Sequence, residues 1–209
     1  MTETAAKKNL DDEIRMLAAM AYGEASPLND EKEMYALASV LERQRVARGY
    51  SSYKVFVDTD KSFSFVTSDG NPRYTAFMKA KDSDIQKNPG MLLAIAAAEN
   101  AKAGGVDYSN GAYFWDGSDI KEKYSSHFKV RHGVKIMDQN HNIYDIKNSQ
   151  KLVILNKIVK KKVAGKTVTE KIEIGRYDHV YESTAGHGGT IFWMQSSDYL
   201  NTTKAKPYK

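Results

Sequence analysis

Residues 10–48 are LDDEIRMLAAMAYGEASPLNDEKEMYALASVLERQRVAR, and apolar side chains recur there three and four positions apart in two segments. This spacing is typical of helices that bury one face, so it predicts a helix over residues 10–24. Ser26-Pro27 is expected to end that helix, because a residue before proline is pushed out of helical geometry. A second helix is expected to start near Asp30 and to cover the rest of this stretch.

Downstream, residues 51–75 are rich in serine and aromatic side chains and predict irregular structure. A short helix is expected over 74–81, and an alanine-rich helix over about 89–103, where Gly104-Gly105 closes it. Later in the chain, β-branched and aromatic residues predict strands over 112–115, 142–146, 152–160, 166–174 and 177–182.

Helices come first in this chain and strands follow, an order typical of the α+β class. A length of 209 residues fits one domain, so 1–209 is expected to form a single unit with residues 120–185 as a β-rich insertion. Within that insertion, Ala164-Gly165-Lys166 predicts the turn of a hairpin that covers about 152–174.

Composition excludes several kinds of chemistry. The chain has no cysteine, so disulfides, thiolate nucleophiles and cysteine-based zinc sites are excluded. The formal net charge is +5, and many lysines lie in KIVKKKVAGKTVTEK, residues 157–171. Two interpretations stay open, lysines that keep an exposed hairpin from aggregating and a patch that attracts a polyanion. No apolar run reaches the about 18 residues of a membrane span, and the N-terminal residues lack the apolar core of a signal peptide.

Glu24 is the last residue of the first expected helix. A carboxylate there faces the negative end of the helix dipole, and burial beside Tyr22 would raise its pKa further. A carboxylic acid that is still protonated near neutral pH is what glycosidic cleavage requires of its general acid. The alternative is an exposed glutamate at a helix end without a chemical role.

Five short segments carry a resemblance, and they are Tyr22-Gly23-Glu24-Ala25, Ala38-Ser39-Val40-Leu41-Glu42-Arg43, Ser62-Phe63-Ser64-Phe65, Asp107-Tyr108-Ser109-Asn110-Gly111-Ala112-Tyr113-Phe114-Trp115 and Gly189-Thr190-Ile191-Phe192-Trp193. In this order they resemble the YGEA, VLNR, QFSW, D-x-T-x-GA-x-x-Y and GNHxFY segments of the SleB-like cell-wall hydrolases. Two positions depart from that pattern, because Glu42 stands where the family usually has Asn and Thr190 where His is common.

The resemblance implies a lysozyme-like helical core and an enzyme that cuts the glycan strands of peptidoglycan. It makes Glu24 the catalytic acid, and by motif position Tyr22 and Ser64 become candidate substrate contacts. The set is also similar to lysozyme-type effectors that type VI secretion systems inject into rival bacteria. This second likeness implies synthesis in the cytoplasm, action in the periplasm or at the cell wall without a signal peptide, and an immunity protein as a partner.

Glu33 is the second candidate catalytic carboxylate. Asp30-x-x-Glu33 is typical of a capping box, in which Glu33 bonds back to the start of its helix. The alternative places Glu33 across a groove from Glu24, where it would align water or stabilise positive charge on the sugar.

Aromatic residues offer further substrate contacts. One interpretation makes Trp115 a platform on which a sugar ring stacks, with Asp116 bonding sugar hydroxyls, and gives Phe192-Trp193 a similar role. The other interpretation is that these residues pack in the core.

The five histidines predict no metal site. None lies in an HExxH motif, and no pair has the carboxylate context of a zinc site, although His127 with His132, or His179 with His187, could converge in the fold. We therefore expect neither metal nor cofactor.

The leading hypothesis is an N-acetylmuramidase, monomeric, that binds peptidoglycan and neither nucleic acid nor membrane. A lytic transglycosylase, in which the muramic 6-hydroxyl attacks and leaves an anhydro end, stays open. A wall amidase or peptidase would need a histidine-based zinc site, and a basic binding module for wall polymer or nucleic acid would make no product.

Overall fold

The computed structural model describes residues 10–60 and 70–209, and its architecture is α+β, as the sequence predicts. The chain forms two compact units. The first unit is Met1–Gly111 with His187–Thr190, and the second is Ala112–Gly186 with Ile191–Lys209. The sequence predicts one domain with an insertion over 120–185, whereas the second unit contains that stretch together with residues on both sides of it.

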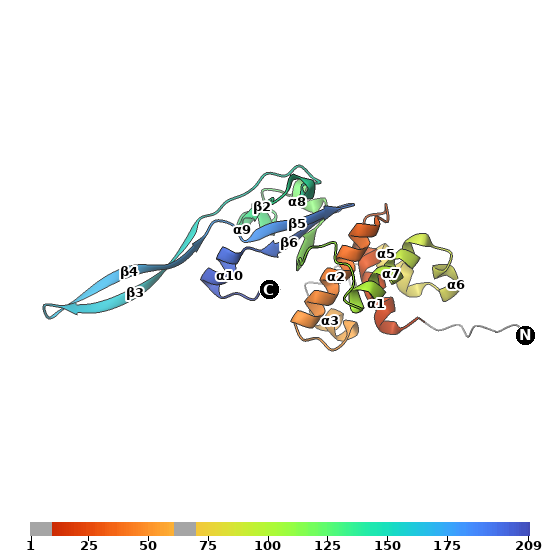
Figure 1. Cartoon of the computed structure of the whole chain (residues 1–209), viewed down its shortest axis with the longest axis horizontal. Helices are drawn as coiled ribbons and strands as arrows, with labels where there is room; N and C mark the ends of the chain where they lie inside the picture. The colour runs from red at the N-terminus through yellow and green to blue at the C-terminus, as the bar shows by residue number, and fades with distance from the viewer. Residues whose placement is uncertain (1–9, 61–69) are drawn as a thin grey trace, which may run out of the picture. The chain divides into compact units, whose positions relative to one another are not determined.

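The first unit is helical. Its elements are α1 (Asp12–Glu24), α2 (Glu31–Ala47), α3 (Tyr53–Thr59), α5 (Pro72–Lys79), α6 (Asp82–Ile85) and α7 (Pro89–Lys102). Helix α1 packs against α2, α5 and α7, and α2 also packs against α7 (Figure 1). The fully buried side chains include Leu17, Met20, Met34, Leu37, Leu41, Phe56 and Phe77. Among the described residues, every helix is too short or too polar to cross a membrane.

Caps fix the starts of the two predicted helices. The Asp11 carboxylate accepts the backbone N–H groups of Glu13 and Ile14 at the start of α1. The Asp30 carboxylate accepts the backbone N–H of Glu33 at 2.8 Å at the start of α2. Such bonds satisfy helix donors that otherwise lack partners, and each is worth about 1 kcal/mol.

The segment that the sequence predicts to be irregular contains α3, so that prediction is wrong over Tyr53–Thr59. The hydroxyl of Ser52 accepts the Val55 N–H and caps the helix, and Tyr53 and Phe56 are buried one turn apart. The β-branched and aromatic residues of this short helix hide its helical period. Burial of two large side chains outweighs their weak helix propensity.

The second unit contains a mixed sheet, a hairpin and short helices. Its elements are β1 (Phe114–Asp116), α8 (Asp119–Glu122), α9 (Phe128–His132), β2 (Val134–Lys135), η2 (Gln139–His141), β3 (Val153–Val163), β4 (Lys166–Tyr177), β5 (Tyr181–His187), β6 (Thr190–Gln195) and α10 (Ser197–Thr203). The sheet order is β1-β6-β5-β2, with β1 antiparallel to β6 and β2 parallel to β5. His187 and Thr190, at the tip of β5 and β6, belong to the helical unit. The core of the second unit consists of Ile120, Val130, Val134, Ile146, Val180, Tyr181, Ile191 and Trp193.

The predicted hairpin is confirmed, as strands β3 and β4 pair antiparallel along their whole length (Figure 1). Its two-residue turn has Ala164 at φ 51° and Gly165 at φ 79°, the positive values that match the twist of paired strands. The hairpin is mostly exposed on both faces, which agrees with its many lysines.

The strand predicted over 142–146 does not form. The Asn142 side chain bonds both the N–H and the C=O of Ile146, at 2.9 Å and 3.0 Å, and closes a loop. Asp145 has a φ of 52°, which no strand tolerates. Local bonding by an asparagine side chain therefore replaces sheet pairing here.

Leu37 and Leu28 allow a matched test of the helical core. Leu37 is fully buried, whereas Leu28 is 81% exposed. We expect Leu37→Ala to lower the free energy of unfolding by about 2–5 kcal/mol, because it leaves a cavity. Leu28→Ala should change it by less than about 0.5 kcal/mol. Urea unfolding followed by far-ultraviolet circular dichroism, which reports the helices, measures both, and equal losses would contradict the packing described.

Candidate functional site

Glu24 is the last residue of α1, and its side chain is partly buried. Two side chains from the start of α5 hold the backbone at this helix end. Asn71 Nδ2 donates to the carbonyl of Gly23 at 2.9 Å, and Arg73 Nε donates to the carbonyl of Tyr22 at 2.8 Å. The two backbone carbonyls that precede Glu24 in the last turn of α1 are therefore both held by side-chain donors.

Gly23 is required by the approach of α5. A Cβ atom at Gly23 would lie 3.0 Å from Tyr74 Cβ and 3.3 Å from the Asn71 side chain. Contacts of 3.0 Å are tighter than almost all real Cβ contacts, so a larger residue would push α5 away. The glycine of the YGEA-like segment thus has a structural cause, since it lets Asn71 reach the end of α1.

Tyr22 is buried and packs between two side chains. The Arg73 guanidinium lies 3.9 Å from the centroid of its ring, and the Phe77 ring centroid lies 5.8 Å away. Arg73 also donates to Asn29 Oδ1 at 2.9 Å. This packing makes Tyr22 a support for the end of α1, and its role as a substrate contact stays a prediction.

Sequence reasoning missed Asn71 and Arg73. The signal was present, because Asn71 caps α5 and Pro72 occupies its first turn, a combination typical of helix starts. What the sequence could not give is the long-range contact between this helix start and the end of α1.

Glu33 is fully buried, and its carboxylate accepts four hydrogen bonds. Oε2 accepts from Ser26 N at 3.1 Å and from Ser26 Oγ at 2.6 Å. Oε1 accepts from Gly189 N at 2.9 Å and from Thr190 Oγ1 at 2.8 Å. Two donors on each oxygen fill the acceptor capacity of a carboxylate. The backbone N–H of Glu33 donates to Asp30, as the capping box predicts. The Glu33 carboxylate, however, accepts from Ser26, Gly189 and Thr190.

Gly188 packs directly on this carboxylate. A Cβ atom there would lie 2.3 Å from Glu33 Oε2, and the φ of Gly188 is 55°. Thr190, which departs from the histidine common in the resembled family, uses its hydroxyl to hold the same carboxylate.

Arg43 links two of the motif segments. Its guanidinium pairs with the Asp107 carboxylate, and Nη1 donates to Ser109 Oγ at 3.3 Å. Asp107 also accepts from Ser109 N at 2.9 Å, from Ser109 Oγ at 2.6 Å and from Gly111 N at 3.0 Å. Burial tends to raise the pKa of Asp107, but the Ser109 bonds, the Arg43 charge and the Gly111 bond together lower it. The carboxylate is therefore held in its charged form.

Glu42, the other departure from the family pattern, has partners of its own. It accepts two bonds from Arg45, each at 2.8 Å, and one from the hydroxyl of Tyr53. Burial tends to raise the pKa of Glu42, but these bonds and the charge of Arg45 outweigh it and lower the pKa. Glu42 thus anchors α3 to α2.

The remaining candidate residues lie elsewhere. Ser64 and its motif fall in residues 61–69, outside the described residues. Trp115 and Asp116 belong to the second unit, where Asp116 is buried and accepts a 2.7 Å bond from Lys129. Asp116 thus has a protein partner and little exposure, and its role in bonding sugar hydroxyls stays a prediction. Phe192 and Trp193 are fully buried, which confirms core packing for this pair.

The histidines also have defined surroundings. His132 Nδ1 lies 2.8 Å from the Phe128 carbonyl, and His141 Nδ1 lies 3.0 Å from Ser183 Oγ. His187 Nε2 lies 3.0 Å from the Tyr108 carbonyl. His127 differs, because two carboxylates, those of Asp116 and Asp119, approach its ring.

Comparison with known proteins adds no relative. No protein-family model, no curated protein and no solved structure matches this chain. The residues themselves are therefore the basis for any functional proposal.

Glu33 and Glu31 provide a matched pair of substitutions on one helix turn. Glu33→Gln places an amide N–H₂ where an oxygen accepts two donors, so we expect a loss of about 3 kcal/mol in the free energy of unfolding. The exposed Glu31→Gln should stay within about 0.5 kcal/mol of wild type. Urea titration followed by circular dichroism measures both, and a neutral Glu33→Gln would show that the four bonds contribute little.

The lowered pKa of Asp107 predicts acid sensitivity. Its ionisation stabilises the fold fully above the ordinary value of 3.8, and this stability is lost as pH falls through the lower folded pKa. Wild type should therefore lose more stability between pH 6 and about pH 3 than Asp107→Asn does. The exposed Asp84→Asn serves as control and should follow wild type. Thermal unfolding across this pH range measures the difference, and parallel curves for all three chains would refute it.

Proposed function

We propose that this protein cleaves the glycan strands of peptidoglycan, as a lysozyme-type N-acetylmuramidase with Glu24 as general acid. The proposal rests on one observation above the others: Glu24 is partly buried at the end of a helix whose last carbonyls are fixed by Asn71 and Arg73. A general acid must be held in place relative to the bond that it protonates, and a braced helix end provides that rigidity.

Contacts made by the motif segments support the same proposal. Arg43 of the VLER segment pairs with Asp107 of the segment at 107–115, and Thr190 of the last segment bonds Glu33. Two of the five segments, at 38–43 and 107–115, are thus joined by a direct contact in the helical unit, and the last segment contacts Glu33, which lies outside the five. Motif matches that arise by chance are not expected to contact one another in the fold.

In the proposed reaction, Glu24 donates its proton to the glycosidic oxygen between N-acetylmuramic acid and N-acetylglucosamine. The leaving sugar departs as its bond to the anomeric carbon breaks, and positive charge develops at that carbon. Attack by water on the anomeric carbon gives a reducing end, and the proton that the water loses restores the acid form of Glu24. In this proposal the substrate is met at the bacterial cell wall.

The surroundings of Glu33 favour a second candidate outcome. Four protein donors already fill its carboxylate, so it has no acceptor left with which to activate water. Without a base from Glu33, the muramic 6-hydroxyl can attack the anomeric carbon of the same sugar, give its proton to the Glu24 carboxylate and leave an anhydro end. Lytic transglycosylation is therefore the alternative, and it uses the same acid at Glu24.

Glu24→Gln is the test of both outcomes. The amide keeps the shape of the side chain but cannot donate this proton, so we expect at least a 100-fold loss in the rate of wall cleavage. Mass spectrometry of purified peptidoglycan after digestion identifies the products, with reducing ends for hydrolysis and anhydro ends for transglycosylation.

Glu31→Gln, an exposed glutamate on α2, is the matched control and should digest at the wild-type rate. Full digestion by Glu24→Gln, or cleavage of stem peptides alone, would end the assignment. Circular dichroism of both variants shows whether a lost rate reflects a lost fold.

A further inference from the structure

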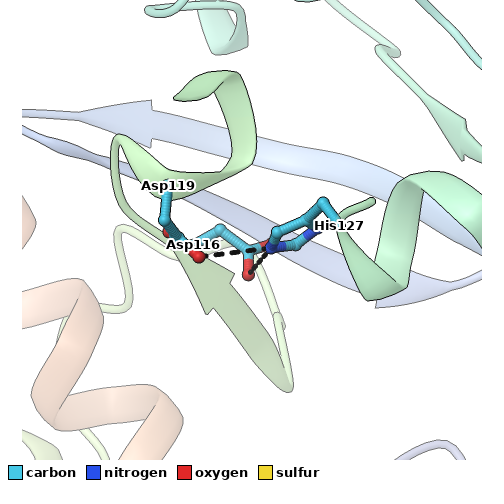
Figure 2. Close-up of side chains that lie close together, drawn as sticks. All are labelled: Asp116, Asp119 and His127. Atoms are coloured by element: carbon cyan, nitrogen blue, oxygen red, sulfur yellow. Dashed lines mark ion pairs between the residues drawn. The ribbon is translucent and has the colours of Figure 1, made fainter. Parts of the chain in front are cut away.

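We propose that Asp116, Asp119 and His127 form a binding site for a divalent transition metal, with zinc as the best fit. The three side chains come from the end of β1, the start of α8 and the residue that precedes α9, and they point toward one another (Figure 2). One ligand atom from each lies within 4.8 Å of the others. The site belongs to the second compact unit, and it does not depend on the function proposed for Glu24.

The separations between the groups fit a shared cation better than direct hydrogen bonds. His127 Nε2 lies 3.4 Å from Asp116 Oδ1 and also 3.4 Å from Asp119 Oδ2. Hydrogen bonds between nitrogen and oxygen fall at about 2.7–3.2 Å. Ligand atoms about 2.1 Å from a tetrahedral zinc ion stand about 3.4 Å from each other. Both distances therefore match the edge of a zinc tetrahedron.

His179 provides a comparison within the same unit. Its Nδ1 lies 2.5 Å from Asp178 Oδ1, and its Nε2 lies 2.9 Å from Glu182 Oε1. Where a histidine of this protein simply pairs with carboxylates, contacts are short and both ring nitrogens are engaged. The longer contacts of His127 are thus not a general property of histidine–carboxylate pairs in this chain.

Two buried atoms of the cluster have no hydrogen-bond partner among the described residues, Asp116 Oδ2 and His127 Nδ1. The side chains of Asp116 and His127 are 9% and 10% exposed, so water reaches them poorly. A buried carboxylate oxygen without a donor is costly, and a bound cation removes that cost. The unpartnered Oδ2 is therefore an independent sign of a missing ligand.

Lys129 positions Asp116 without filling the site. Its Nζ donates to Asp116 Oδ1 at 2.7 Å and to the Trp115 carbonyl at 3.2 Å. The bond fixes the orientation of the carboxylate and uses one acceptor site of Oδ1, so the second site of Oδ1, which faces His127, and the unpartnered Oδ2 remain for a metal. Two carboxylates and one ammonium leave a net charge of −1 when His127 is neutral, which favours a divalent cation.

The donor set selects the class of metal. Calcium and magnesium prefer oxygen ligands alone, whereas an imidazole nitrogen with two carboxylates suits zinc and other first-row divalent ions. Three protein ligands leave the fourth position of a tetrahedron for water or another ligand. Asp119 is 52% exposed on its side chain, so the site is open to solvent at that ligand.

The test is calorimetric titration of Zn²⁺ into the full chain after removal of metal with a chelator. We expect one zinc per chain and a loss of at least about 100-fold in affinity for Asp119→Asn and for His127→Gln, because each removes one of three ligands. Titration with Mg²⁺ should show no binding. Cobalt in place of zinc should give the intense visible absorption of a tetrahedral site.

Matched controls separate this site from loose surface binding. His132→Gln removes an exposed histidine five positions from His127, and Asp198→Asn removes an exposed carboxylate of the same unit. Both should bind zinc as wild type does. Asp119 is largely exposed, so Asp119→Asn is expected to fold even where His127→Gln does not. Absence of zinc binding, binding unchanged in Asp119→Asn, or an equal loss in His132→Gln would each overturn the proposal.

Discussion

The helical unit depends on one buried charge, the carboxylate of Glu33. Its four hydrogen bonds join the start of α2 to Ser26, just beyond the end of α1, and to Gly189 and Thr190, which lie more than 150 positions later in the chain. A charge without solvent is tolerable only when every lone pair is occupied, and this one meets that condition. Gly188 has to be a glycine because a Cβ atom would displace the carboxylate. One carboxylate thus fixes both the loop after Glu24 and the return of a distant segment to the helices.

That arrangement changes how the two candidate carboxylates are interpreted. The sequence leaves two interpretations of Glu33 open, a capping box and a partner of Glu24 across a groove. In the structure the two carboxylates differ in kind, because Glu33 is fully buried and fully bonded, whereas Glu24 is partly buried at a braced helix end. The Arg73 guanidinium donates to the carbonyl of Tyr22 at the end of α1. Its positive charge offsets part of the negative potential of this helix end, which was expected to favour the protonated form of Glu24. The proposal that Glu24 donates a proton is therefore supported by its position at the braced helix end more than by the helix dipole.

Local patterns predicted much of this fold, and long-range contacts account for most of what they missed. Apolar spacing and caps place α1 and α2 to within a few residues, and the turn at Ala164 defines the hairpin, because each depends on neighbours in sequence. The capping box at Glu33 was half right, since its N–H bonds Asp30 but its carboxylate finds Gly189 and Thr190. The spacing of residues near Glu33 cannot predict hydrogen-bond partners that lie more than 150 positions later. For the same reason, the sequence did not predict the bonds that Asn71 and Arg73 make to the end of α1, which lies about 50 positions earlier.

The cluster of Asp116, Asp119 and His127 could not be predicted from the sequence for a related reason, because its one histidine pairs with no second histidine. Asp116 and Asp119 lie three positions apart across the turn between β1 and α8, and His127 joins them only because α9 follows a short loop. The carboxylates of Glu33 and Asp116 differ in how many of their oxygens have hydrogen-bond donors. At Glu33 every acceptor has a donor, so the group is explained by the fold alone. At Asp116 an oxygen remains without a donor among the described residues although Lys129 lies beside it, and this difference is what the proposed metal site would account for.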